Sequence, residues 1–351
     1  MPSPTTPSSA TIAYVDPAAE SVPHAPQAPS LVPADSTAVA GQVVAVIPPA
    51  AVDTVVDPAA VLARHCVTEA GDPHGPVLLL AHGFGAGQQA WTRLLPHFAD
   101  HRVVLFDYAG SGRTRLGDFD HDRHASLTGY AQDLLEVCAA LDLHDVHVVG
   151  HSVSAMIALL GAAAQPDRFA SLALLAPSPR YVDDPATGWV GGFSLEDIHE
   201  LLESLDSNYY AWSAAMAPVV MGTPGSPDLE AELTESFLGT HPDAAATFAK
   251  AIFLSDSRDV LAQVNHPTVV LQCRHDALAP EQVGAAVAAA LPQGQLVALS
   301  ATGHCPHISA PAETATAIRG HLHCVATADV ATADVATADV ATAEPRATLR
   351  P

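Results

Sequence analysis

Positive charge is scarce in this chain. The 351 residues contain 14 Lys+Arg against 38 Asp+Glu, which gives a formal net charge of −24, and Lys250 is the only lysine. Nucleic acids and anionic membranes are bound by clustered Lys and Arg side chains, so we exclude both as partners. No Lys or Arg precedes Arg64. A signal peptide, which begins with a positively charged segment, is therefore not expected.

Cysteine and long apolar runs are also rare. The five cysteines form no Cys-x-x-Cys pair and no Cys/His ligand spacing, so neither a disulfide framework nor a zinc site is expected. Such usage suits a reducing compartment. Pro or Gly interrupts the apolar runs well before the roughly 20 residues that a membrane-spanning helix needs. We therefore expect a cytoplasmic protein with no metal and no cofactor.

The two ends of the chain have a biased composition. Residues 1–58 contain 11 of the 29 prolines, and we expect them to be disordered, with Val43–Ile47 able to pair transiently. Residues 324–351 contain a five-residue repeat that begins with Val325-Ala-Thr-Ala-Asp329. A period of five fits neither the faces of a helix nor those of a strand. We predict a disordered acidic tail, with a partner-binding segment as the alternative.

The region 59–323 has the pattern of a single α/β domain. Short Val- and Leu-rich runs alternate with segments of helical periodicity, which is typical of a parallel sheet buried on both faces. The clearest predicted strands are Val77–Ala81, Val103–Phe106, Val146–Val149, Leu172–Ala176, Thr268–Gln272 and Leu296–Leu299. Between them we predict the helices Leu127–Leu141, Val153–Ala164 and Pro280–Leu291.

One connection is too long for a simple crossover. About ninety residues separate Ala176 from Thr268, and they carry helix-capping signatures at Ser194 and Ser226. The helical segments predicted within this insertion are Ser194–Leu205, Asn208–Met216, Pro227–Leu238 and Pro242–Leu254. An insertion after a sheet strand is expected to cover the carboxyl ends of the strands, where open α/β sheets bind ligands.

The strongest local motif is Gly150-His-Ser-Val-Ser154. It follows a predicted strand and opens a predicted helix, which is the context of a nucleophile elbow that exposes a serine hydroxyl. The usual motif ends in glycine, but Ser154 is also small. We predict that Ser152 is the nucleophile; a buried structural turn is the alternative.

A serine nucleophile needs a base and an acid that orients the base. Asp276 and His304 each follow a predicted strand, in the chain order Ser, acid, His that this arrangement requires. We predict Asp276 as the acid and His304 as the base. The alternatives are His307 for the base, which we expect to be a packed histidine, and Asp183 or Asp184 for the acid. We expect His275 to be exposed.

Two glycine-rich turns follow other strands. The turn His82-Gly-Phe-Gly85 stands where a loop could supply oxyanion donors, and we predict the backbone N–H groups of Phe84 and Val153 as the oxyanion hole. His82 itself is expected to be a structural hydrogen-bonding residue. The turn Ala109–Gly112 lacks the lysine of a phosphate-binding loop and is expected to be a tight structural turn.

From about Ala60 to Leu322, the chain resembles the RsbQ-like α/β-hydrolases. These are bacterial stress-signalling proteins related to the karrikin and strigolactone receptors of plants. The motifs that carry the resemblance are His82–Gly85, Leu105–Tyr108, Gly110–Gly112, Gly129–Asp133, Gly150–Ser154, Pro177–Pro179, Gly191–Phe193, Asn208–Trp212, Phe253–Asp256 and Gly303–His307. It implies a mostly parallel eight-stranded sheet, with a four-helix lid at about 186–257 inserted after the sixth strand. The terminal extensions have no counterpart in the family.

The resemblance also implies a site and a function. A Ser152/His304/Asp276 triad would face a hydrophobic pocket, and the matching pocket positions are Phe84, Val153, Phe193, Trp212 and Phe253. The implied activity is hydrolysis of a small hydrophobic ester or lactone, linked to stress signalling. A PAS-domain phosphatase is the partner that the resemblance implies. The oligomeric state stays open.

Several rival functions use the same residues. A metabolic carboxylesterase would turn over one substrate rapidly, whereas a ligand-binding signalling module would hydrolyse its ligand slowly or incidentally. Cofactor-free haloperoxidase or C–C hydrolase chemistry would also use this triad. A dehalogenase with an aspartate nucleophile is disfavoured, because Ser152 occupies the elbow.

Overall fold

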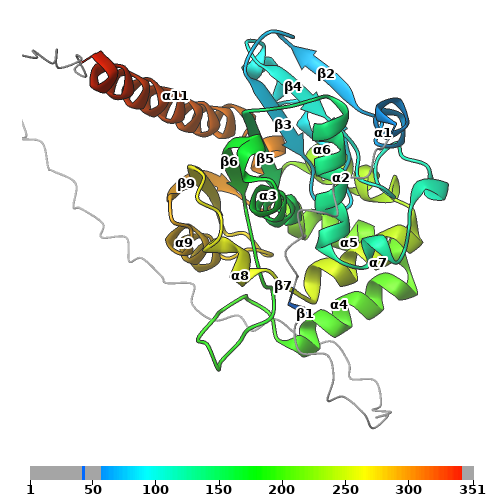
Figure 1. The fold of residues 1–351 in the computed structure, drawn as a ribbon. Helices are drawn as coiled ribbons and strands as arrows, with labels where there is room; N and C mark the ends of the chain where they lie inside the picture. Colours follow the sequence, from blue (N-terminus) through cyan, green and yellow to red (C-terminus); the bar gives the residue numbers. More distant parts are fainter. Residues whose placement is uncertain (1–41, 44–56, 342–351) are drawn as a thin grey trace, which may run out of the picture. The chain divides into compact units, whose positions relative to one another are not determined.

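A seven-stranded sheet forms the centre of the domain in the computed structural model, which describes residues 42–43 and 57–341 of the chain (Figure 1). Its spatial order is β2-β4-β3-β5-β6-β8-β9, in which β2 is antiparallel to β4 and the other neighbours are parallel. The strands are β2 (Thr68–Gly71), β3 (Val77–Ala81), β4 (Arg102–Leu105), β5 (Val146–His151), β6 (Phe169–Leu175), β8 (Thr268–Arg274) and β9 (Gly294–Thr302). The mostly parallel sheet is confirmed.

The number of strands differs from the expectation of eight. Within the described residues the sheet has seven strands, and the lid follows the fifth of them. The segment before β2 forms helix α1 (Pro58–Arg64), because Pro58 occupies the first helical position and the Asp57 side chain accepts a hydrogen bond from Ala59 N–H. Strand β2 was not predicted, since its sequence Thr-Glu-Ala-Gly is that of a short polar edge strand.

Helices cover both faces of the sheet, and Figure 1 shows α2 (Leu127–Ala140) and α3 (Val153–Ala164) side by side. Successive side chains of a strand point to opposite faces of the sheet, so the core forms two layers, one on each face. In β3, for example, Leu79 packs with α2 and α3, whereas Leu78 and Leu80 pack on the opposite face. Other elements outside the lid include α8 (Arg258–Leu261), α9 (Glu281–Ala290), α10 (Pro306–Ser309), and the 3₁₀ turns η2 (Gln88–Trp91), η3 (Leu95–Phe98), η4 (Leu116–Asp118), η5 (Arg123–Ala125) and η6 (Pro166–Arg168).

The lid consists of four helices inserted between β6 and β8, as predicted. They are α4 (Leu195–Ser207), α5 (Tyr209–Met221), α6 (Pro227–Leu238) and α7 (Pro242–Phe253). The capping signature of Ser194 is confirmed, because its hydroxyl accepts from Asp197 N–H while the Asp197 carboxylate accepts from Ser194 N–H. Ser226 makes no such side-chain bond, although Pro227 does begin α6.

The C-terminal tail corrects one prediction. Helix α11 runs from Pro311 to Ala341, so residues 324–341 are helical rather than disordered. Its first half is anchored by buried Ile318 and Leu322 on the sheet, and the repeat that follows is rich in alanine and free of Pro and Gly. Elongating an anchored helix needs no new nucleus and no apolar face. Residues 342–351 lie outside the described residues.

Within the N-terminal extension, the structure describes residues 42–43 and 57–58. Strand β1 (Gln42–Val43) pairs in parallel with β7 (Ser255–Asp256), which directly follows lid helix α7. The pair includes Val43, the start of the run for which we expected transient pairing. Asp57 and Pro58 cap and begin helix α1. The rest of the segment predicted to be disordered, residues 1–41 and 44–56, lies outside the described residues.

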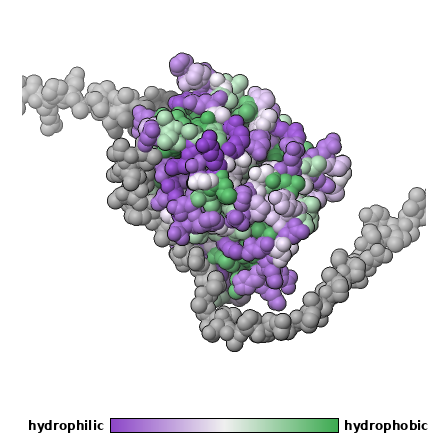
Figure 2. Space-filling model, turned by 90° about the vertical axis from the view of Figure 1, so that its right-hand side faces the viewer, coloured by the Kyte–Doolittle hydropathy of each residue, from purple (hydrophilic) through white to green (hydrophobic). Residues whose placement is uncertain are grey.

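The helices and the surface can be compared with the expectation that no segment of this chain spans a membrane. None of the described helices is both long and apolar enough to cross a membrane. On the face shown in Figure 2, hydrophilic residues predominate and hydrophobic residues form small separate patches.

Candidate active site

Ser152 occupies a sharp turn between β5 and α3. Its backbone is in a strained conformation, with φ 56° and ψ −122°, and its N–H donates to the Leu175 carbonyl at 2.8 Å. A Cβ atom at Gly150 would lie 2.4 Å from the Ser154 carbonyl oxygen, so this position tolerates no side chain. The turn therefore has the geometry of a nucleophile elbow.

Three predicted side chains form one hydrogen-bonded chain. His304 Nε2 lies 2.7 Å from Ser152 Oγ, and His304 Nδ1 lies 2.8 Å from Asp276 Oδ2. The other carboxylate oxygen of Asp276 accepts from the backbone N–H groups of Leu278 and Ala279. Burial alone would raise the pKa of Asp276, but His304 and these N–H groups lower it below its usual value. Asp276 is therefore an anion at neutral pH.

The backbone of His304 is bonded to the lid. Its N–H donates to the Val220 carbonyl at 2.9 Å, and the Thr302 hydroxyl donates to the Gly222 carbonyl at 3.0 Å. These acceptors stand at the end of α5, where helix carbonyls have no partner within the helix. Gly303 has φ 78°, and a Cβ there would lie 1.9 Å from the Met221 carbonyl oxygen. The loop that carries His304 thus caps helix α5.

The alternative acids and bases do not reach this chain of bonds. Asp183 accepts from the N–H groups of Gly191 and Gly192, and Asp184 pairs with Arg258. His275 is exposed, as expected.

His307 is the alternative base, and we expect it to be a packed histidine. It is buried, and its ring packs against Trp91 and His151 at centroid distances of 4.6 and 4.3 Å. It is therefore a packed histidine.

The loop after β3 lies against the nucleophile. A Cβ atom at Gly83 would lie 3.4 Å from Ser152 Cβ, which brings the backbone of Phe84 close to the elbow. Val153 begins α3, so its N–H is among the unpaired donors at a helix N-terminus. His82 has the expected structural role: Nδ1–H donates to the Gly83 carbonyl at 2.9 Å, and Nε2 accepts from Tyr108 N–H.

The turn Ala109–Gly112 is structural, as predicted. It encloses the buried Asp107 carboxylate, whose oxygens accept from the N–H groups of Gln88 and Arg113 and from the Gln88 side-chain amide. A Cβ atom at Gly112 would lie 2.4 Å from the carboxyl carbon of Asp107. An acidic side chain at the centre of the turn excludes a phosphate.

A mainly apolar cavity of about 50 Å³ lies between the triad and the lid. Of the expected lining residues, Phe84, Trp212 and Phe253 do line it. Phe193 does not; its ring centroid lies 6.4 Å from that of Tyr181, which does line the cavity, and its part in binding a substrate stays a prediction. Val153 is buried and is also absent from the lining.

Most of the lining was not identified from the sequence. The unpredicted lining residues are Ala86, Ala90, His151, Tyr181, Met216, Val220, Leu233, Ser236, Phe237, Ile252, Leu278, Cys305, His307 and Ile308. Helical periodicity could have marked Leu233 and Phe237 as one face of α6. No sequence pattern distinguishes a helix face that lines a cavity from one that packs in a core.

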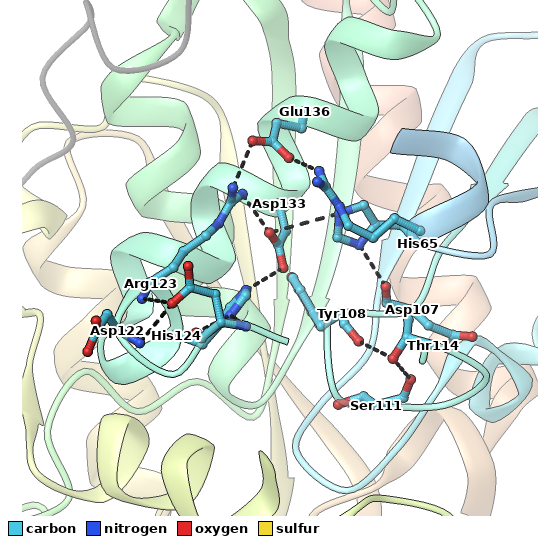
Figure 3. A network of polar contacts seen from close by, with 12 residues as sticks. His65, Asp107, Tyr108, Ser111, Thr114, Asp122, Arg123, His124, Asp133 and Glu136 are labelled. Carbon is cyan, nitrogen blue, oxygen red and sulfur yellow. Dashed lines mark hydrogen bonds and ion pairs between the residues drawn. The ribbon is translucent and has the colours of Figure 1, made fainter. Parts of the chain in front are cut away.

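A second buried polar network lies around α2 (Figure 3). Asp133 accepts from His124 Nε2–H at 3.0 Å and from Arg123 at 2.6 Å, and Arg123 also pairs with Glu136 at 3.0 Å. His65, Asp133 and Glu136 bring ligand-type atoms within 4.8 Å of one another. Because arginines already pair with both carboxylates, the group is organised as an ion-pair network rather than as a metal site.

Comparison with known proteins agrees with this geometry. The family model described as "alpha/beta hydrolase fold" matches residues 76–311. The chain is 37% identical over 250 residues to the "Karrikin insensitive 2 receptor CA" of Petunia hybrida, covering 70% of this chain and 91% of that protein. It is 35% identical over 245 residues to the "Strigolactone esterase D14" of Arabidopsis thaliana, covering 69% and 91%. A solved hydrolase from Oleispira antarctica superposes with a TM-score of 0.74 at 37% identity, covering 78% of this chain and 98% of that one.

The fold, the Ser152–His304–Asp276 bonds and these matches define an α/β serine hydrolase. Within that class, the chain belongs to the family of the strigolactone and karrikin receptors, which includes RsbQ. The resemblance given by the sequence motifs is therefore confirmed.

Proposed function

We propose that this protein is a ligand-binding signalling hydrolase, which takes up a small hydrophobic lactone of the butenolide type and cleaves it slowly. The proposal rests above all on one observation: the Ser152–His304–Asp276 chain opens into a small apolar cavity beneath the lid. The relatives named as a karrikin receptor and a strigolactone esterase support a lactone ligand and a signalling role. They favour the slow signalling module over the metabolic carboxylesterase.

The proposed reaction follows from the bonds in the site. Ser152 Oγ attacks the lactone carbonyl while its proton passes to His304 Nε2. The Asp276 carboxylate holds His304 Nδ1–H and stabilises the imidazolium. The N–H groups of Phe84 and Val153 receive the oxyanion. His304 then protonates the leaving oxygen, and a water molecule activated by the same histidine hydrolyses the acyl-serine.

The small volume of the cavity favours slow turnover. A volume of about 50 Å³ holds no more than a few water molecules. A ring-sized ligand therefore enters and leaves only when lid side chains or helices move, and such motions often limit kcat. Since the loop of His304 caps α5, changes at the base and movement of the lid are also linked through backbone hydrogen bonds.

The partner and the pathway stay predictions. The resemblance to RsbQ implies a PAS-domain phosphatase and a link to stress signalling. Capture of such a phosphatase by the wild type in the presence of a butenolide, but not by Ser152→Ala, would support both.

A time course with a fluorogenic butenolide tests the function. Wild type and Ser152→Ala are compared while intact-protein mass is recorded. A burst of one product per protein with a lasting adduct, absent in Ser152→Ala, supports the proposal. Fast multiple turnover without an adduct would instead indicate a metabolic carboxylesterase. Equal hydrolysis by both proteins would show that Ser152 is not the nucleophile.

A further inference from the structure

His151 stands directly before Ser152 and bonds to the backbone of His304. It ends strand β5, is buried, and places Nε2 at 2.8 Å from the His304 carbonyl oxygen. A carbonyl oxygen accepts only, so Nε2 carries the proton and donates it. Burial and the neighbouring His304 lower the pKa of His151 to about 3, so the ring is neutral and Nδ1 carries no proton.

Packing fixes the orientation of this ring. It lies between His304 and His307, at centroid distances of 5.1 and 4.3 Å. On its other edge, a Cβ atom at Gly83 would lie 2.6 Å from Nδ1. Among the described residues, Nδ1 has no hydrogen-bond partner, so the bond to His304 is the polar contact that the buried ring makes.

The bond completes the support of the His304 backbone. The N–H of His304 is held by Val220 of the lid, and its carbonyl is held by His151 of the elbow. We propose that His151 is a positioning residue, which sets the distance between His304 Nε2 and Ser152 Oγ through its bond to the His304 carbonyl. Because His151 and Ser152 are consecutive, the same turn of backbone places the nucleophile and anchors the base.

The inference rests on the proposed function, in which Ser152 and His304 are nucleophile and base. A role in positioning differs from a role in packing, because only the former needs an N–H donor at this place. His151→Gln keeps a donor that can reach the carbonyl, whereas His151→Leu fills space without a donor. Trp91→Phe is the matched control, since Trp91 packs in the same row of rings through His307 and, among the described residues, makes no hydrogen bond or ring contact with the triad.

The first readout is kinetic. We expect His151→Leu to lower kcat by about 10- to 100-fold with KM little changed, because small misplacements of a reacting group are costly. His151→Gln should restore most of kcat, and Trp91→Phe should keep it. Equal losses in all three variants, in proportion to lost thermal stability, would overturn the proposal in favour of packing.

The second readout does not depend on hydrolysis. In crystal structures of the variants, the distance from His304 Nε2 to Ser152 Oγ should exceed about 3.2 Å in His151→Leu, and return to hydrogen-bonding range in His151→Gln. An unchanged 2.7 Å in His151→Leu would overturn the proposal. Equal hydrolysis by wild type and Ser152→Ala would instead refute the proposed function, while the measured distance would still decide the role of His151.

Discussion

Two buried histidine–aspartate pairs occur in this protein, and they differ in what surrounds them. His304 Nδ1 lies 2.8 Å from Asp276, and His124 Nε2 lies 3.0 Å from Asp133. In both pairs the pKa of the aspartate is lowered, against the effect of burial, by the hydrogen-bonding histidine. Burial, pairing and a shifted pKa therefore do not distinguish a catalytic pair from a structural one.

The second ring nitrogen does distinguish the two pairs. Nε2 of His304 meets the hydroxyl of Ser152 at the edge of a cavity, whereas Nδ1 of His124 lies 2.8 Å from the backbone carbonyl of Asp120. Asp133 is further closed off by Arg123 (Figure 3). One pair thus leads to a nucleophile that a ligand can reach, and the other is satisfied entirely by the protein.

The largest effect is expected from Asp276→Asn. An asparagine cannot hold His304 in the tautomer that accepts the serine proton, nor stabilise its cation. We expect kcat to fall by about 10³- to 10⁴-fold with a fluorogenic ester, while the protein stays folded. A fall in kcat of less than about tenfold would show that the His304–Asp276 pair is structural, like the His124–Asp133 pair.

Asp133→Asn should give the opposite result. Removing one partner of a buried ionic network leaves the others unpaired, so we expect the free energy of unfolding to fall by about 3 kcal/mol or more. Hydrolysis per folded molecule should be unchanged. Urea denaturation measures the loss, and Asp122→Asn, at an exposed neighbouring position, is the control. A large fall in kcat without lost stability would contradict the comparison.

Gly303→Ala should separate the catalytic pair from its anchor on the lid. The new Cβ would collide with the Met221 carbonyl, and φ is positive, so we expect a loss of about 2 kcal/mol in stability and a lower kcat. Gly225→Ala is the matched control, because φ is also positive there but nothing lies within 4 Å of the new Cβ. Equal kcat values for the two variants would show that the cap on α5 does not position His304.

The sequence predicts the His304–Asp276 pair but not the His124–Asp133 pair. The triad could be located because each member follows a strand, and parallel strands bring their carboxyl ends to one edge of a sheet. The partners of Asp133 come from η5 and from His65, directly after α1, and the approach of these segments to α2 depends on packing that no motif encodes. Most of the lining of the cavity was missed for the same reason. The tail was mispredicted because alanine-rich helices need no apolar face once they are anchored.

A dependence of stability on pH is also expected, and it involves the surroundings of both pairs. Burial lowers the pKa of five histidines, to about 3 for His151 and about 4 for His321. The five are His65, His82, His151, His307 and His321. Each is neutral in the folded protein, whereas the unfolded chain binds a proton below about pH 6.5. Their contribution is therefore complete above that pH and is lost as the pH falls toward the folded values.

As the pH falls, the loss of stability due to the histidines begins at a higher pH than the loss due to the aspartates. The lowered pKa values of Asp276 and Asp133 give stability that is present above about pH 4 and lost below it. Urea denaturation should thus show stability falling between pH 6.5 and 5, by about 2 kcal/mol for His151 alone, and falling again below pH 4. His321→Gln, which lies away from both pairs on α11, should reduce the first step and leave the second unchanged. Constant stability from pH 7.5 to 5 would show that the buried histidines accept protons without unfolding of the protein. It would also show that the surroundings of the two histidine–aspartate pairs are not buried, which contradicts the comparison.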